Sequence, residues 1–80
     1  MEPEETPALI VDARNLACPL PIIRVKRAIS QVAVGEVVEV LATDPGSLAD
    51  FPAWTELTGH DLVAVRHEGS VYTFDIRRSK

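Results

Sequence analysis

The four residues Cys18-Pro19-Leu20-Pro21 constrain the fold of this chain more than any other segment. Proline lacks a backbone N–H and is poorly tolerated inside a helix or a central strand, so the pair marks a boundary between elements. The apolar run at residues 8–13 comes before this boundary and predicts a short strand. A helical pattern follows it. The only cysteine of the chain is therefore expected at the entrance to a helix.

The helical pattern covers residues 19–33 and has one apolar face. Its apolar side chains recur at spacings of three and four residues: Ile22, Val25, Ile29 and Val32. Pro19 suits the first helical position, and Pro21 still falls in the first turn, where no intrahelical N–H bond is lost. Gly35 is expected to end the pattern.

A second strand and a second helix are predicted next. Residues 36–43 are rich in valine, which indicates a central strand. Asp44 is a good helix N-cap and Pro45 a good first helical residue. Pro52 is expected to split the helix into two pieces, and Gly59 to end it.

The last part of the chain predicts a hairpin. Residues 61–67 form a third strand, 68–70 a tight turn, and 71–78 a fourth strand with Tyr72, Phe74 and Ile76 on one face. The order βαβαββ indicates an α+β fold with a mixed four-stranded sheet and two helices on one face. Residues 1–7 are acidic and read as a flexible tail, which leaves 8–80 as a single domain.

Composition excludes several classes of function. A net charge of −4 argues against non-specific nucleic-acid binding, which requires clustered cations. No apolar run approaches the length of a membrane span, and the acidic N-terminus does not resemble a secretory signal, so we expect a cytoplasmic protein. One cysteine excludes an internal disulfide, and His60 and His67 show no ligand spacing, so no metal or cofactor is expected.

The reactivity expected of Cys18 depends on its thiolate fraction, because the thiolate is the nucleophile. A helix end stabilises an adjacent anion by ~0.3–1 kcal/mol, which is less than one pKa unit at ~1.36 kcal/mol per unit. If Cys18 is the N-cap, only the Leu20 N–H can reach the sulfur, because Pro21 has none. A strongly acidic thiol would need a cation, for which Arg14 and Arg24 are the candidates.

The residues around Cys18 favour a carrier over a self-contained enzyme. The chain has no Cys-x-x-Cys for an internal redox cycle, and no histidine base stands at a recognisable spacing. An 80-residue chain also has little room for a substrate pocket. The alternative is that Cys18 is a small buried hydrophobe, as free cysteines often are. The flanking prolines favour an exposed thiol, presented to other proteins.

The chain resembles the TusA/SirA-like sulfur-carrier family over residues 9–78. The resemblance rests on Asp12-Ala13, Leu16 to Pro21, Val34-Gly35-Glu36, Asp44-Pro45, Asp50 to Trp54, Gly59-His60 and Tyr72 to Arg77. It implies a two-layer α/β sandwich and a sulfurtransferase that carries a persulfide on Cys18, with Pro19, Leu20 and Pro21 shaping its presentation. The implied donor is a cysteine desulfurase or a rhodanese. The implied acceptor serves tRNA thiolation, molybdenum-cofactor metabolism or sulfur oxidation.

Two positions depart from the pattern of some members, which have an arginine before the cysteine and an acidic residue between the prolines. Here these positions are Ala17 and Leu20. Both flank the sulfur, so the resemblance leaves open which donor and acceptor the chain serves.

Other side chains have competing interpretations. Arg24, Lys26 and Arg27 form either a docking patch for an acidic partner or an ordinary solvated helix face. Asp12, His60, Trp54 and Phe51 are expected to be structural, with His60 bonding the last carbonyls of the second helix.

The sequence is also compatible with two other functions, a non-catalytic regulatory or partner-binding module and a selenium-handling relative. A carrier that exposes one face to successive partners is expected to be a monomer.

Overall fold

The computed structural model describes residues 6–80. The first five residues of the expected flexible tail, 1–7, lie outside this range. The chain forms six elements in the predicted order: β1 (Leu9–Ala13), α1 (Leu20–Ile29), β2 (Val37–Ala42), α2 (Ser47–Thr58), β3 (Asp61–Glu68) and β4 (Val71–Arg77).

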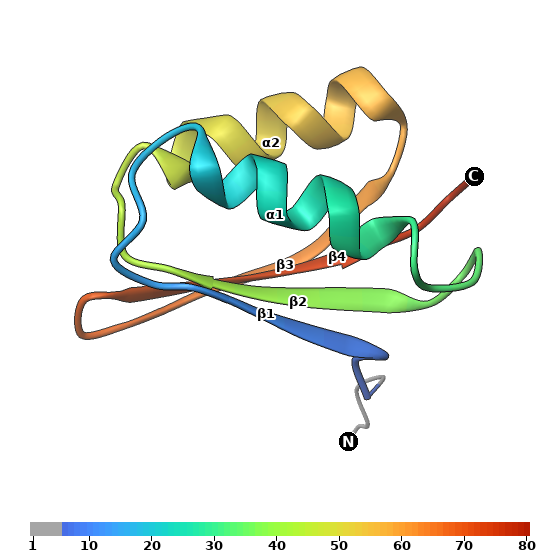
Figure 1. Cartoon of the computed structure of the whole chain (residues 1–80), viewed down its shortest axis with the longest axis horizontal. Helices are drawn as coiled ribbons and strands as arrows, with labels where there is room; N and C mark the ends of the chain where they lie inside the picture. Colours follow the sequence, from blue (N-terminus) through green and yellow to red (C-terminus); the bar gives the residue numbers. More distant parts are fainter. Residues whose placement is uncertain (1–5) are drawn as a thin grey trace.

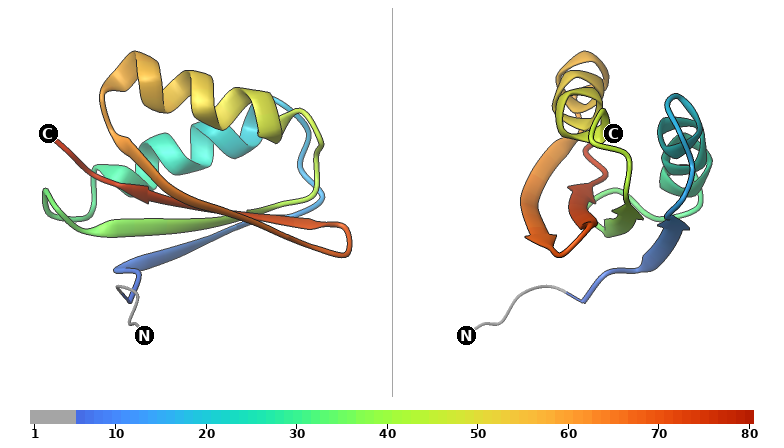
Figure 2. Two further views of the ribbon diagram at one scale, coloured as in Figure 1. Left: turned by 180° about the vertical axis from the view of Figure 1, so that it is seen from behind. Right: turned by 90° about the vertical axis from the view of Figure 1, so that its left-hand side faces the viewer.

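The four strands form one mixed sheet in the order β1-β2-β4-β3. β1 and β2 are parallel, with Ala13 opposite Ala42 at their ends, and β4 is antiparallel to both of its neighbours. Both helices cover the same face, α1 over β1 and β2 and α2 over β3 and β4 (Figure 1, Figure 2). The predicted α+β two-layer sandwich is confirmed.

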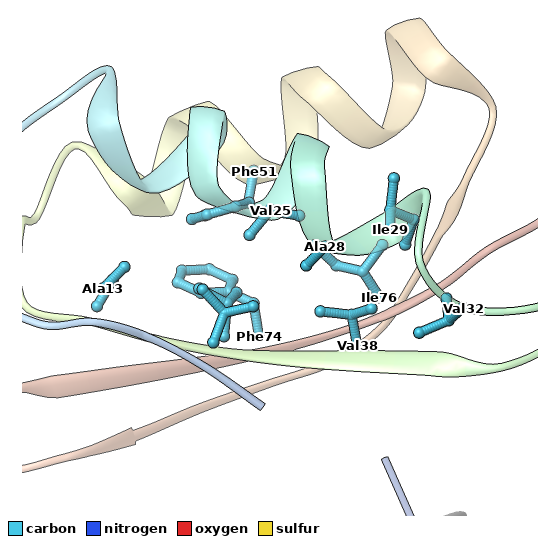
Figure 3. Packing of buried hydrophobic residues seen from close by; sticks show 12 residues of the cluster. Ala13, Val25, Ala28, Ile29, Val32, Val38, Phe51, Phe74 and Ile76 are labelled. Atoms are coloured by element: carbon cyan, nitrogen blue, oxygen red, sulfur yellow. The ribbon is translucent and has the colours of Figure 1, made fainter. Parts of the chain in front are cut away.

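The core lies between the helices and the sheet (Figure 3). Val25 and Ile29 of α1 are buried there, as the helical spacing predicted. Phe51 of α2 and Phe74 of β4 are both fully buried, with ring centroids 4.6 Å apart. Phe51 is therefore a core residue, as expected, whereas Trp54 is only partly buried at the margin of the core.

The first helix is shorter than the predicted 19–33. Pro19 is its N-cap rather than its first residue, and the helix ends at Ile29. The Ser30 hydroxyl donates to the Arg27 carbonyl at 2.7 Å, a local bond that competes with the helical backbone pattern. Val32 is nevertheless buried. Its place in the apolar pattern therefore predicted correctly that it belongs to the core, although it lies beyond the end of the helix.

The second helix differs from prediction at its start and at Pro52. Its N-cap is Gly46, not Asp44, because residues 44–46 first form a turn in which the Ser47 N–H donates to the Asp44 carbonyl at 2.9 Å. The helix then runs through Pro52 without a break. Proline removes a single N–H bond there, and burial of Phe51 holds this part of the helix on the sheet. Gly59 ends the helix at φ 85°, as predicted.

The uncovered face of the sheet carries an ion-pair cluster across three strands. Arg66 of β3 donates from Nη1 to Asp75 Oδ2 of β4 at 2.7 Å and from Nη2 to Glu39 Oε1 of β2 at 3.0 Å. Burial, with Asp75 beside it, raises the pKa of Glu39, while Arg66 opposes that shift. The other oxygen of Asp75, Oδ1, is buried without a hydrogen-bond partner. One arginine thus compensates two adjoining carboxylates.

The C-terminal residues are tied to the loops at one end of the sheet. Arg78 Nη1 donates to the Val32 carbonyl at 2.6 Å, and the Gly35 N–H donates to the Arg78 carbonyl at 2.7 Å. His60 accepts a hydrogen bond at Nδ1 from the Ser79 N–H at 3.1 Å. The hydrogen bond of His60 is therefore made with the segment after β4 and not with the helix carbonyls that were expected. Among residues 6–80 no helix is long and apolar enough to cross a membrane.

Candidate functional site

The loop that carries Cys18 lies against the segment after β2. Because β1 and β2 are parallel neighbours, their carboxyl ends meet at the same edge of the sheet. The Asn15 N–H donates to Thr43 Oγ1 at 2.8 Å, and the Cys18 N–H donates to Asp44 Oδ2 at 2.9 Å. Asn15 adopts a left-handed φ of 66°, a conformation that asparagine tolerates better than most residues. The cysteine loop is therefore held by two hydrogen bonds that its backbone donates to the side chains of Thr43 and Asp44.

Cys18 is exposed and free, one residue before the N-cap of α1. The Leu20 N–H was expected to reach the sulfur if Cys18 were the N-cap, but the N-cap is Pro19, and this N–H donates to the Ala17 carbonyl at 2.9 Å. Pro21 is buried in the first turn, whereas Pro19 and Leu20 are exposed beside the sulfur. The motif thus combines one proline that anchors the helix with a surface formed by Cys18, Pro19 and Leu20.

The electrostatic environment of Cys18 is acidic. A hydrogen bond to the Asp50 carboxylate, partial desolvation, and the negative charges of Asp50 and Asp44 together raise the pKa of the Cys18 thiol above its ordinary value. Each of these causes disfavours the thiolate. The surroundings of Cys18 therefore favour the neutral thiol over the thiolate.

Arg14, expected as a cation for the thiolate, pairs with Asp12 instead. Its Nε donates to Asp12 Oδ1 at 2.8 Å and its Nη2 to Asp12 Oδ2 at 2.9 Å, and both side chains are about half exposed. These hydrogen bonds, with smaller contributions from the charges of Arg14 and Arg24, lower the pKa of Asp12 to about 2. Asp12 was expected to be structural, and in the structure it binds the Arg14 side chain at the start of the cysteine loop.

This pairing gives a prediction for the titration of Asp12. In the wild type, the Asp12 carboxyl is expected to titrate near 2, and in Arg14→Ala its pKa should rise toward the ordinary ~3.9. Carboxyl chemical shifts followed by NMR between acid and neutral pH measure both values. An unchanged midpoint in Arg14→Ala would show that this pair is not formed in solution.

The basic residues of α1 spread over its outer half. At 100° per residue, Arg27 points away from the core while Arg24 and Lys26 lie on its two flanks. All three are exposed. Leu20 and Ile23, also exposed, lie on the same outer side as Arg27. A partner approaching Cys18 along α1 would therefore meet apolar and basic groups together.

Two acidic residues near the sulfur, Asp44 and Asp50, were not predicted as parts of the site. Asp44 was assigned to helix capping, and Asp50 entered only as part of the family pattern. The parallel pairing of β1 and β2 brings the segment after β2 beside Cys18, and spacing along the chain does not reveal this proximity. Among residues 6–80, no group of three or more acidic, histidine or cysteine side chains is arranged to hold a metal ion.

The fold and the site define a class of protein: a small two-layer α/β domain that presents one exposed thiol beside the first turn of its first helix. The family described as Sulfurtransferase TusA matches residues 9–78. The chain belongs to this family of sulfur-carrier proteins.

Individual relatives agree with this assignment. The sulfur carrier protein TusA of Allochromatium vinosum is 44% identical over 69 residues, which cover 86% of this chain and 91% of the relative. A putative sulfur carrier protein of Bacillus subtilis, YrkF, is 40% identical over 70 residues, which cover 88% of this chain but only 38% of that longer protein. The crystal structure of a SirA-like protein from Desulfitobacterium hafniense matches with a TM-score of 0.77 and 26% identity, covering 90% of this chain and 99% of that one.

Proposed function

We propose that this protein is a sulfurtransferase that receives sulfane sulfur as a persulfide on Cys18 and relays it to an acceptor protein. The observation that carries the proposal is the position of Cys18. The only thiol of a chain in the sulfur-carrier family is exposed, and its loop is held in place by Thr43 and Asp44.

The proposed transfer needs no oxidant or cofactor. The donor holds its sulfur as a deprotonated persulfide, and the Cys18 sulfur attacks the outer atom of that group. A bond forms between Cys18 Sγ and the transferred sulfur, and the S–S bond of the donor breaks. The Cys18 proton ends on the sulfur that the donor retains. Delivery to the acceptor repeats the exchange in the opposite sense, and no net oxidation occurs.

The surface around the thiol supports transfer between proteins. Pro19, Leu20 and Ile23 are exposed near Cys18, so a partner can cover the sulfur and exclude water. Arg24, Lys26 and Arg27 provide the positive charge for docking an acidic partner in a chain of net charge −4. The donor classes that fit are a cysteine desulfurase or a rhodanese, and the acceptor is a further sulfurtransferase in tRNA thiolation, molybdenum-cofactor metabolism or sulfur oxidation.

Sulfur loading is tested by intact-protein mass spectrometry. After incubation with a cysteine desulfurase and L-cysteine, the wild type is expected to gain the mass of one sulfur atom, and a reductant should remove it. Cys18→Ala should show no gain. The substitution removes an exposed side chain, so its folding, followed by circular dichroism, should match the wild type.

A negative result with the desulfurase calls for a second donor, thiosulfate with a rhodanese. Failure of folded wild type with both donors would contradict the carrier function and favour the partner-binding module. Preferential loading from a selenium donor in direct competition would favour the selenium-handling relative.

A further inference from the structure

Two carboxylates act on the cysteine loop, Asp44 through a backbone hydrogen bond and Asp50 through its effect on the thiol. Asp44 accepts the Cys18 N–H at Oδ2 (2.9 Å) and the Gly46 N–H at Oδ1 (3.3 Å), so it joins the cysteine loop to the start of α2. Asp50, in the first turn of α2, is the second carboxylate that acts on the thiol, and it is the largest cause of the raised pKa of Cys18. Both aspartates are only partly exposed. The sulfur therefore lies beside a pair of negative charges that the fold holds in place.

The charged groups that act on the sulfur are both negative. Asp50 acts from α2 and Asp44 from the loop before it, and each disfavours a negative sulfur. Arg14 is engaged by both oxygens of Asp12, and the charge of Arg24 also acts on Asp12. The two arginines that were expected to stabilise the thiolate therefore act on the Asp12 carboxylate, and neither is among the charges that shift the pKa of Cys18.

Loading with sulfur changes the charge at this position. The S–H of a persulfide is a stronger acid than that of a thiol, because the neighbouring sulfur is polarisable and spreads the negative charge. At neutral pH the empty carrier is neutral at Cys18, and the loaded carrier is an anion. The neutral thiol of the empty carrier has a proton to donate to a carboxylate, whereas the anionic sulfur of the loaded carrier is repelled by the negative charges of Asp50 and Asp44.

We propose that Asp50 and Asp44 are positioning residues that act through Cys18, keeping the empty carrier in its unreactive thiol form and favouring release of the sulfur once it is loaded. This inference rests on the proposed sulfur-carrier function and deepens it. The partner that fits such a site brings a cationic side chain, which neutralises the carboxylates while the sulfur is exchanged. Outside the complex, the thiol is protected from alkylating and oxidising agents.

The first test measures the rate of Cys18 alkylation by iodoacetamide as a function of pH. In Asp50→Asn and Asp44→Asn the profile should move to lower pH, and the rate at pH 7 should rise about fivefold, the factor expected for one charge pair about 4 Å apart in water. Glu56→Gln, an exposed carboxylate on the same helix, is the matched control and should follow the wild type. Asparagine keeps an acceptor oxygen for the backbone bonds, so a purely structural role would not shift the profile.

The second test measures how tightly each carrier holds its sulfur. At a fixed ratio of glutathione persulfide to glutathione, Asp50→Asn should retain more sulfane sulfur than the wild type, again by about fivefold in the equilibrium ratio. Alkylation profiles that coincide with the wild type in both variants would overturn this inference, even in a protein that loads normally. A wild type that takes up no sulfur would overturn the proposed function instead, so the two failures are distinguishable.

Discussion

Phe51→Ala is expected to lower the free energy of unfolding by about 3–5 kcal/mol, the range for truncating a fully buried aromatic residue. The ring lies between α2 and the sheet with its centroid 4.6 Å from that of Phe74, so its loss leaves a cavity and removes an aromatic contact. Domains of this size have little stability to spare, and the variant should be partly or wholly unfolded at 37 °C.

Urea denaturation followed by circular dichroism measures this effect. Leu57→Ala on the same helix is the matched control: Leu57 is 85% exposed, and its loss should change stability by less than about 0.5 kcal/mol. Equal effects of the two substitutions would contradict the placement of Phe51 in the core.

Arg66→Ala is expected to destabilise the protein at pH 7 by about 1–3 kcal/mol, because two adjoining carboxylates lose their shared partner. The side chains of Glu39 and Asp75 are only 20% and 16% exposed, but Arg66 itself is half exposed. Solvent screening of the guanidinium keeps the effect below that of breaking a fully buried pair. Arg66→Lys keeps the charge but cannot bond both carboxylates with the same geometry, so it should be intermediate.

The destabilisation should depend on pH in a defined direction. The pKa of Glu39 is already raised in the folded protein, and Arg66→Ala removes the two effects of Arg66 that lower it. A carboxyl whose folded pKa exceeds its unfolded value of ~4.3 favours folding below that value and loses this contribution as the pH rises through the folded pKa. The deficit of Arg66→Ala should therefore be greatest near neutral pH and narrow toward pH ~4.3. Urea denaturation across this range measures it, and a deficit that widens on acidification would contradict the assignment.

The periodicities of the sequence were sufficient to predict the six elements and their faces. The alternation in residues 71–78 placed Phe74 and Ile76 inward, and the valine-rich run became β2 beside the centre of the sheet. The failures occurred where tertiary packing overrode local preference. Pro52 lies inside a continuous helix because its neighbour Phe51 anchors that helix in the core.

The site was only half predictable. Pro19 and Pro21 marked the helix entrance and indicated that Cys18 would be exposed, as it is in the structure. The acidic neighbours could not be inferred from spacing along the chain, because Asp44 is 26 residues from Cys18. Their proximity depends on the parallel pairing of β1 and β2, which no local pattern specifies. The charge next to the sulfur is therefore a property of the topology.

The topology also separates the termini of the domain from its sulfur. β1 begins, and β4 ends, beside the start of β2, whereas the cysteine loop leaves the opposite end of the sheet (Figure 1). A tether, a solid support or an additional domain joined through the end of β4 would extend away from Cys18. This architecture would allow the same module to operate alone or as one part of a larger polypeptide without obstructing access to its thiol.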